Sequence, residues 1–128
     1  MIVDDDPLLR RLFGGYLAKA GYDTIYATNG NDGRETARRL QPDLILMDIN
    51  MPGLEDGLET AIRMKGEEQT KSIPIIFVTN NDLSFLKEKK LKEIAAMDYI
   101  HKSIDGEEFI KRIKKAITLI KKTKKTTE

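Results

Sequence analysis

Four short apolar segments of this chain each end in polar residues that could do chemistry. Aspartates follow the first segment, a single aspartate the second, a threonine the third and a lysine the fourth. The endings, in chain order, are Asp4-Asp5-Asp6, Asp48, Thr79 and Lys102. If the segments are parallel strands of one sheet, their carboxyl ends meet at a single edge, where open α/β sheets bind ligands. Gathered there, these groups could hold a divalent cation and a phosphoryl group.

The aspartates form the acidic part of this expected cluster. Asp4, Asp5 and Asp48 at one edge would repel one another, and each would raise the pKa of the others, unless a cation lay among them. Mg²⁺ suits such a place because it takes oxygen ligands, needs few carboxylates and keeps several waters for an incoming phosphate. The alternative is that the acids only cap the following helix, and we accept that interpretation for Asp6 alone, since one cap needs one carboxylate.

Asp48 directly follows four apolar residues, and burying a carboxylate there is costly unless the group has a function. Beside Mg²⁺ it would be a competent nucleophile, as in enzymes that pass through an aspartyl-phosphate. Thr79 could donate to a phosphoryl oxygen, and the Lys102 ammonium could pair with the carboxylate before transfer and with the phosphate after it. Taken alone, Thr79 fits ordinary turn chemistry and Lys102 a solvated lysine. Their order and placement together favour the site.

Alternating strand and helix patterns would position these endings. Strands are expected at residues 1–3, 22–28, 44–47, 75–78 and 99–101, and helices at 7–20, from about 30 to 40, 57–65, 83–96 and 105 to about 122. Asp6 and Pro7 are typical of a helix start, and Gly21 of a helix end. Five such units predict an α/β fold, a three-layer αβα sandwich with a doubly wound parallel sheet and right-handed crossovers.

The bulk composition fits one domain without strong attraction to nucleic acid or membrane. The chain has 128 residues, a formal net charge of +1 and no cysteine, so a disulfide framework and a thiolate metal site are excluded. Its apolar runs are too short to span a membrane, and we expect a cytoplasmic protein. The basic residues toward the C-terminus favour a solvated helix face over a nucleic-acid site. Residues 121–128, rich in Lys and Thr, are expected to form a fraying tail or linker.

The chain resembles a response-regulator receiver domain of two-component phosphorelay signalling, from Ile2 to about Ile120. The resemblance depends on four blocks of sequence, at residues 3–7, 42–53, 74–79 and 98–102. It implies a flavodoxin-like fold with strand order 2-1-3-4-5. The domain is accordingly expected to cover residues 1–120.

The resemblance also implies roles for individual residues. Asp48 matches the aspartate that accepts phosphate from a phosphohistidine on a sensor histidine kinase or a histidine phosphotransfer protein. The implied Mg²⁺ ligands are Asp5 directly, Asp4 through water, Asp48 and the backbone carbonyl of Asn50. Thr79 and Lys102 match the residues that bind the phosphoryl oxygens. Tyr99 matches the aromatic residue that changes position in the switch. Phosphorylation would alter the face formed by the fourth helix, fifth strand and fifth helix, for a downstream effector, an output domain or a second copy of the chain.

Some residues depart from the family pattern. Ser103 follows Lys102 where the family usually has a proline in a cis bond, and we predict a trans bond because cis before serine costs about 2.5–4 kcal/mol. Asn80 replaces a small residue beside the phosphoryl site and predicts slower phosphate turnover. The loop 53–57 is one residue longer than usual, and Gly14-Gly15 within the first helix has no explanation beyond close packing. The single histidine, His101, is interpreted as an ordinary strand residue.

Two other classes of function stay open at this point. A degenerate receiver would act only as a docking or dimerisation module and would bind no Mg²⁺. A Mg²⁺-dependent phosphohydrolase would use Asp48 as nucleophile, but such enzymes usually need a second aspartate two residues on, where this chain has Asn50. We therefore expect a signalling switch that catalyses only its own phosphorylation and dephosphorylation, not a conventional enzyme.

Overall fold

A parallel β-sheet forms the centre of the molecule. The computed structural model describes residues 1–51, 53–80 and 94–127. Within them, five parallel strands lie in the order β2-β1-β3-β4-β5, as the resemblance implied. The strands are β1 (Ile2–Val3), β2 (Tyr26–Ala27), β3 (Ile45–Asp48), β4 (Ile75–Thr79) and β5 (Asp98–His101).

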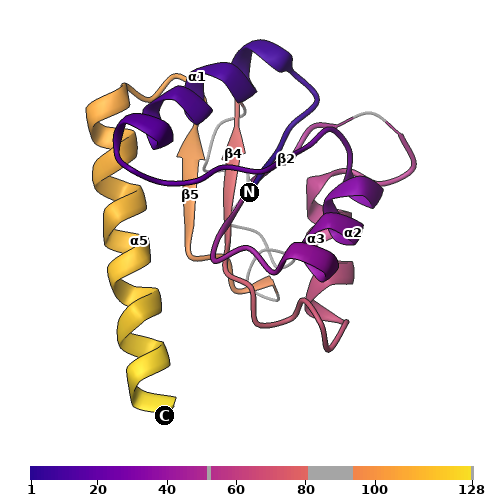
Figure 1. Cartoon of the computed structure of the whole chain (residues 1–128). Coiled ribbons are helices and arrows are strands. Elements are labelled where there is room, and N and C mark those ends of the chain that lie inside the picture. The colour runs from indigo at the N-terminus through magenta and orange to yellow at the C-terminus, as the bar shows by residue number, and fades with distance from the viewer. Residues whose placement is uncertain (52, 81–93, 128) are drawn as a thin grey trace.

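Helices cover both faces of this sheet. Figure 1 shows α1 and α5 on one side of the strands and α2 and α3 on the other. Their bounds are α1 (Pro7–Lys19), α2 (Gly30–Leu40), α3 (Gly57–Lys65) and α5 (Gly106–Thr127). The helix expected over 83–96 falls largely outside the described residues. The three-layer αβα architecture is therefore confirmed for the rest of the chain.

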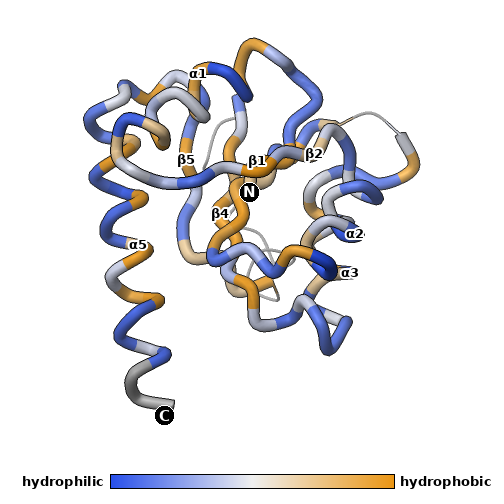
Figure 2. The backbone as a smooth tube through the Cα atoms, in the orientation of Figure 1, coloured by the Kyte–Doolittle hydropathy of each residue, from blue (hydrophilic) through white to orange (hydrophobic). Residues whose placement is uncertain are grey.

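Two apolar cores hold these layers together, one on each face. Successive residues of a strand point to opposite faces, so β3 and β4 supply both cores. With α2 and α3 they bury Ala37, Ile45, Met47, Ala61, Met64 and Phe77, and with α1 and α5 they bury Phe13, Leu17, Leu46, Ile76, Phe109 and Ile113. Every residue of β3 and β4 is buried. Figure 2 shows the hydrophobic colour along the central strands, as expected for a sheet that is covered by helices on both faces.

The start of α1 follows the predicted capping pattern. Asp6 has extended backbone, its Oδ1 accepts a hydrogen bond from the N–H of Leu8 at 2.9 Å, and Pro7 occupies the first helical turn. Gly21, with φ of 89°, follows the helix end in the left-handed region that glycine tolerates. The chain leaving β1 is thus turned sharply into α1, which leaves Asp4 and Asp5 at the edge of the sheet.

Two sequence predictions of element length were wrong. The strand expected over 22–28 is reduced to β2, because β1 offers it only the partners Ile2 and Val3. The last helix does not end near Lys122 but continues to Thr127. That residues 121–128 serve as a tail or linker after the domain stays a prediction. Lysine is a good helix former and is favoured near a helix C-terminus. The Thr123 hydroxyl also donates to the Leu119 carbonyl at 3.0 Å within the helix.

The glycine pair in α1 is partly explained. A Cβ on Gly14 would lie 2.2 Å from the Tyr26 hydroxyl oxygen, so glycine there leaves room for the tyrosine of β2 in its present position. Nothing lies within 4 Å of the corresponding position on Gly15, and nothing in the structure explains that glycine.

No helix within the described ranges combines the length and hydrophobicity that crossing a membrane requires. The expected cytoplasmic location stays a prediction.

Candidate functional site

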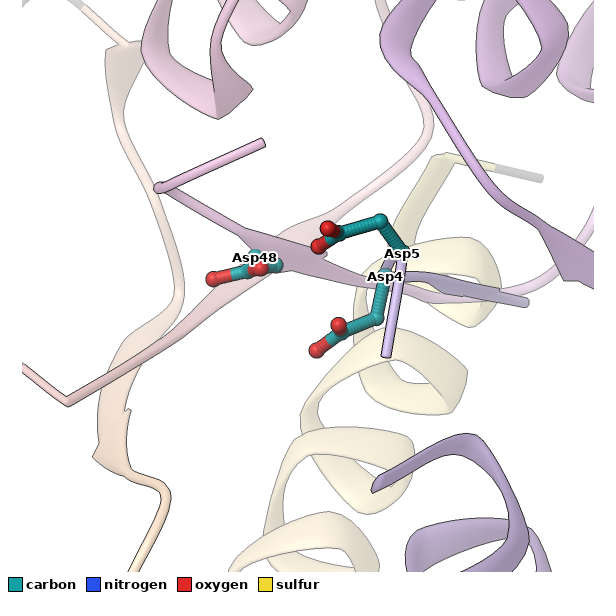
Figure 3. A group of neighbouring side chains, drawn as sticks. All are labelled: Asp4, Asp5 and Asp48. Atoms are coloured by element: carbon teal, nitrogen blue, oxygen red, sulfur yellow. The ribbon is translucent and has the colours of Figure 1, made fainter. Parts of the chain in front are cut away.

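Three carboxylates gather at the carboxyl edge of the sheet. Asp4 and Asp5 directly follow β1, and Asp48 is the last residue of the neighbouring strand β3. One carboxylate oxygen from each lies within 4.8 Å of the others, and Figure 3 shows the three side chains turned toward a common space. Asp4 and Asp48 are buried, while Asp5 is exposed. The convergence predicted from residues more than forty positions apart is confirmed.

Lys102 brings a positive charge to the same place. Its Nζ lies 3.3 Å from Oδ2 of Asp4 and 3.1 Å from Oδ1 of Asp48, and its side chain is 12% exposed. Burial alone would lower the pKa of Lys102, but the charges of Asp48 and Asp4 outweigh that effect and raise it. Lys102 follows β5, so the ammonium reaches across β4 to the acids. It stays charged and compensates part of their repulsion.

Asp48 keeps one oxygen without a partner. Its Oδ1 faces Lys102 and also accepts from the N–H of Asn50 at 3.2 Å. Its Oδ2 is buried and has no hydrogen-bond partner within the part of the chain that the structure describes. Burial and, to a smaller extent, the charge of Asp4 raise the pKa of Asp48 to about 6, although Lys102 opposes both effects. An unsatisfied buried oxygen is costly, which is typical of a group kept for a ligand or a reaction.

Thr79 lies beside this cluster at the end of β4. It is fully buried, and its register partner on β5 is His101, the residue before Lys102. The N–H of Lys102 donates to the Thr79 carbonyl at 2.9 Å, so the two predicted phosphoryl-binding residues are held together by backbone. Tyr99, also on β5, is half-buried, and its ring stacks on Phe77 with centroids 5.9 Å apart. Burial raises the pKa of the Tyr99 hydroxyl.

The loop after Asp48 is held at both of its ends. The N–H of Gly57 donates to the Ile49 carbonyl at 2.9 Å, and a Cβ on Gly57 would come within 2.0 Å of the Asp48 carbonyl oxygen. Only glycine permits this close approach of α3 to the end of β3. Asn50, whose carbonyl is the expected fourth ligand, is exposed at the start of the loop. Pro52 lies outside the described residues.

Two supporting contacts were not foreseen from the sequence. Arg10 of α1 donates from Nη1 to the Asp4 carbonyl at 2.7 Å. Arg34 of α2 binds Glu55 of the loop at 2.8 Å, with both side chains nearly buried, and the Thr60 hydroxyl donates to the same carboxylate at 3.0 Å. Burial alone would raise the pKa of Glu55, but Arg34 and Thr60 lower it. Each contact joins separate elements, and no local pattern in the sequence signals such a pairing.

The bond between Lys102 and Ser103 is trans, as predicted, since the described residues contain no cis peptide bond. Asn80 is exposed directly after Thr79, next to the site. The described contacts do not test whether the Asn80 side chain slows phosphate turnover, so that effect stays a prediction. The long loop 53–57 has Gly53 at φ of 106° and the exposed Leu54 near its tip.

Comparisons with known proteins point to a single family. Residues 1–114 match the family described as "Response regulator receiver domain". The chain is 37% identical to protein PilH of Pseudomonas aeruginosa, over 88% of this chain and 92% of PilH. It is also 37% identical to the polar-differentiation response regulator DivK of Brucella anthropi, over 89% and 91% of the two chains. A solved N-terminal domain of a response regulator/sensory box/GGDEF 3-domain protein from Carboxydothermus hydrogenoformans has a TM-score of 0.81, 28% identity and 95% coverage of both chains.

Proposed function

This chain belongs to the response regulator receiver family, and from that premise we propose that Asp48 accepts a phosphoryl group from a phosphohistidine of a partner protein. Receiver domains are signalling switches and not conventional enzymes. The observation that carries the proposal is the buried Asp48 carboxylate beside Lys102 and two further acids, with one oxygen that has no partner among the described residues. An oxygen left available in this way supports a role for Asp48 as nucleophile, since the oxygens of a purely structural buried acid are usually both satisfied.

The proposed transfer forms one bond and breaks another. An oxygen of Asp48 attacks the phosphorus, and the bond between phosphorus and the donor imidazole nitrogen breaks. The imidazole leaves with the electron pair of that bond and takes a proton from solvent. Lys102, 3.1 Å from Oδ1, offers its ammonium to the charge that moves onto the phosphoryl oxygens. Thr79, at the end of the adjacent strand, supplies a hydroxyl donor to the same oxygens.

The residues at this edge fit a magnesium ion. Three carboxylates with oxygens within 4.8 Å of one another are hard donors, and Oδ2 of Asp48, which has no partner in the described ranges, leaves one position open to a cation. We assign direct ligation to Asp5, Asp48 and the Asn50 carbonyl, and a water-mediated contact to Asp4, whose Oδ2 faces Lys102. When bound, Mg²⁺ would neutralise negative charge on the acids and on the incoming phosphoryl group.

The proposed output is a change of surface near β5 and α5. A phosphoryl group on Asp48 adds nearly two negative charges and new acceptor oxygens, which attract Lys102 and the Thr79 hydroxyl. Tyr99, which stacks on Phe77 in this structure, is the proposed switch aromatic. The fourth helix of the switching face lies outside the described residues. We infer that this face binds an effector, an output domain or a second copy of the chain, and that the donor is a sensor histidine kinase or a histidine phosphotransfer protein.

Labelling with a small phosphoryl donor tests the proposal. Wild-type protein incubated with acetyl phosphate and Mg²⁺ should gain the mass of one phosphoryl group, and neither the Asp48→Asn variant nor wild type with a chelator should gain it. A matched control is Asp23→Asn, which removes an exposed carboxylate away from the site. A variant Asp48→Asn that is labelled as fast as wild type would exclude Asp48 as the acceptor.

The two rival functions lead to different results in the same assay. A docking module without phosphorylation would show neither labelling nor a Mg²⁺-dependent change in stability. A phosphohydrolase would consume acetyl phosphate continuously with little labelled protein. No described contact favours either rival, and Asn50 lacks the carboxylate that a phosphohydrolase would use as acid and base.

A further inference from the structure

His101 is the single histidine of the chain, and it adjoins both proposed phosphoryl-binding residues: Thr79 across the sheet and Lys102 in sequence. It is the last residue of β5, its register partner on β4 is Thr79, and the next residue is Lys102. The ring is partly buried at the carboxyl edge of the sheet. The sequence alone suggested an ordinary strand histidine, but three contacts of its imidazole show more order than that interpretation implies.

Both ring nitrogens of His101 have partners. Nε2 lies 3.0 Å from the backbone carbonyl oxygen of Asn80. Nδ1 lies 2.7 Å from Oγ of Ser103 and accepts from the N–H of Ser103 at 3.1 Å. A carbonyl can only accept and a backbone N–H can only donate, so these contacts select one neutral tautomer, with the proton on Nε2.

The imidazole therefore connects two chain segments next to the site. Asn80 leads the chain out of β4 directly after Thr79, and Ser103 leads it out of β5 directly after Lys102. The pairing of Thr79 with His101 in the sheet and the hydrogen bond from the Lys102 N–H to the Thr79 carbonyl also connect these two ends. The His101 bridge adds a connection one residue further on, where β4 and β5 have already ended.

The trans serine at position 103 makes this bridge possible. Its backbone N–H and its hydroxyl both face Nδ1, and a proline at the same place would have neither donor. Two departures from the pattern of the family, Asn80 and Ser103, are thus joined through His101. For Asn80 the backbone carbonyl and not the side chain makes the contact.

We propose that His101, as the Nε2–H tautomer, is a positioning residue that holds Thr79 and Lys102 at the correct separation for the phosphoryl oxygens. This inference rests on the proposed phosphoacceptor function of Asp48. His101 acts through its neighbours and touches neither the phosphoryl group nor the cluster of acids. Its loss should therefore slow phosphorylation while the affinity for Mg²⁺ stays the same.

The tautomer can be read directly because the chain has one histidine. Nitrogen-15 NMR of the imidazole of wild type near neutral pH should show a protonated Nε2 and an unprotonated Nδ1. The Asn80→Ala variant keeps the backbone carbonyl and should give the same spectrum. A protonated Nδ1, or averaging between tautomers as in a free imidazole, would overturn the bridge whatever the phosphorylation assays show.

Kinetics of acetyl phosphate labelling then test the positioning role. His101→Phe removes all three polar contacts of the ring and should lower the labelling rate about tenfold at saturating Mg²⁺. His101→Gln can still donate to the Asn80 carbonyl and should recover part of that loss. Mg²⁺ affinity and the charge state of the acids should not change in either variant. Wild-type labelling rates in His101→Phe, or an equal loss in both variants through weaker Mg²⁺ binding, would overturn the inference.

Failure of the inference and failure of the proposed function give different results. If the proposed function is wrong, wild type itself is not labelled at Asp48, and the positioning role falls with it. If only the inference is wrong, wild type is labelled and His101→Phe matches it. Should His101→Phe not fold, the Ser103→Ala variant, which removes only the hydroxyl from the bridge, takes its place with a smaller expected loss of rate.

Discussion

Replacing Asp48 with asparagine should make the metal-free protein more stable. Asp48 is buried, its Oδ2 has no partner in the described part of the chain, and Asp4 adds like charge. Asparagine has nearly the same shape without the charge, so Asp48→Asn removes the cost of holding an ion in this place. Lys102 keeps its contact with Asp4 in the variant. The site is thus expected to trade stability for reactivity.

The size of the effect follows from the pKa of Asp48, which rises from 3.8 to about 6 on folding. Each unit corresponds to about 1.4 kcal/mol, so the ionised carboxylate costs up to about 3 kcal/mol. Since its folded-state pKa is raised, the folded protein binds more protons between these two values, and stability falls as pH rises from about 4 to about 6. Because Lys102 loses one partner and the amide is still buried, we expect Asp48→Asn to gain about 1–3 kcal/mol at about pH 8.

Denaturation in urea with a chelator present measures this gain. The difference in the free energy of unfolding between Asp48→Asn and wild type should be small near pH 4, increase between about pH 4 and 6, and stay constant at higher pH. Added Mg²⁺ should stabilise wild type by about 2.7 kcal/mol at 100 times its Kd and the variant by less. Asp23→Asn, at an exposed position, should change little. A variant Asp48→Asn that is no more stable than wild type at about pH 8 without metal would refute the reasoning.

Four further predictions concern single residues, three of them around the site and the fourth, Gly15, within α1. Asn80→Ala should speed loss of phosphate from Asp48, which the decay of labelled protein measures, and an unchanged decay would remove the proposed role of that side chain. Gly57→Ala should lower the free energy of unfolding measured in urea by about 2 kcal/mol or more, because its Cβ would meet the Asp48 carbonyl oxygen at 2.0 Å. Gly15→Ala, which places a methyl group in open space, should raise the free energy of unfolding by about 0.8–1 kcal/mol in the same assay. Lys102→Met should abolish most labelling while Mg²⁺ still binds, and a normal labelling rate would contradict its proposed role.

The positions of the acids could be predicted because they depend on regular structure. An apolar run such as 44–47 has no polar alternation, so it indicates a strand buried on both faces. Parallel strands then carry their last residues to one edge, and Asp4, Asp48 and Lys102 follow from that geometry alone. Asp6 and Pro7 likewise start α1 through local capping chemistry. Each of these inferences needed only short-range pattern and topology.

What could not be predicted depends on contacts between distant residues. The close packing at Gly14 comes from the Tyr26 hydroxyl, twelve positions away in sequence but adjacent in space. The pairing of Arg34 with Glu55 needs the packing of α2 against the loop, which no periodicity reveals. The three contacts of His101 depend on the ends of β4 and β5 lying side by side. Helix length failed for another reason, since a polar helix end carries no apolar stripe to mark it.

The central claim is that Asp48 is the phosphoacceptor of a magnesium-dependent site formed by strand ends. The most direct measurement is reduction of the labelled protein with borohydride, which converts an aspartyl phosphate to homoserine, followed by peptide mass mapping. The account predicts homoserine at position 48 alone, and only when both acetyl phosphate and Mg²⁺ were present. Homoserine at Asp4 or Asp5, or labelling of position 48 that is indifferent to Mg²⁺, would contradict it.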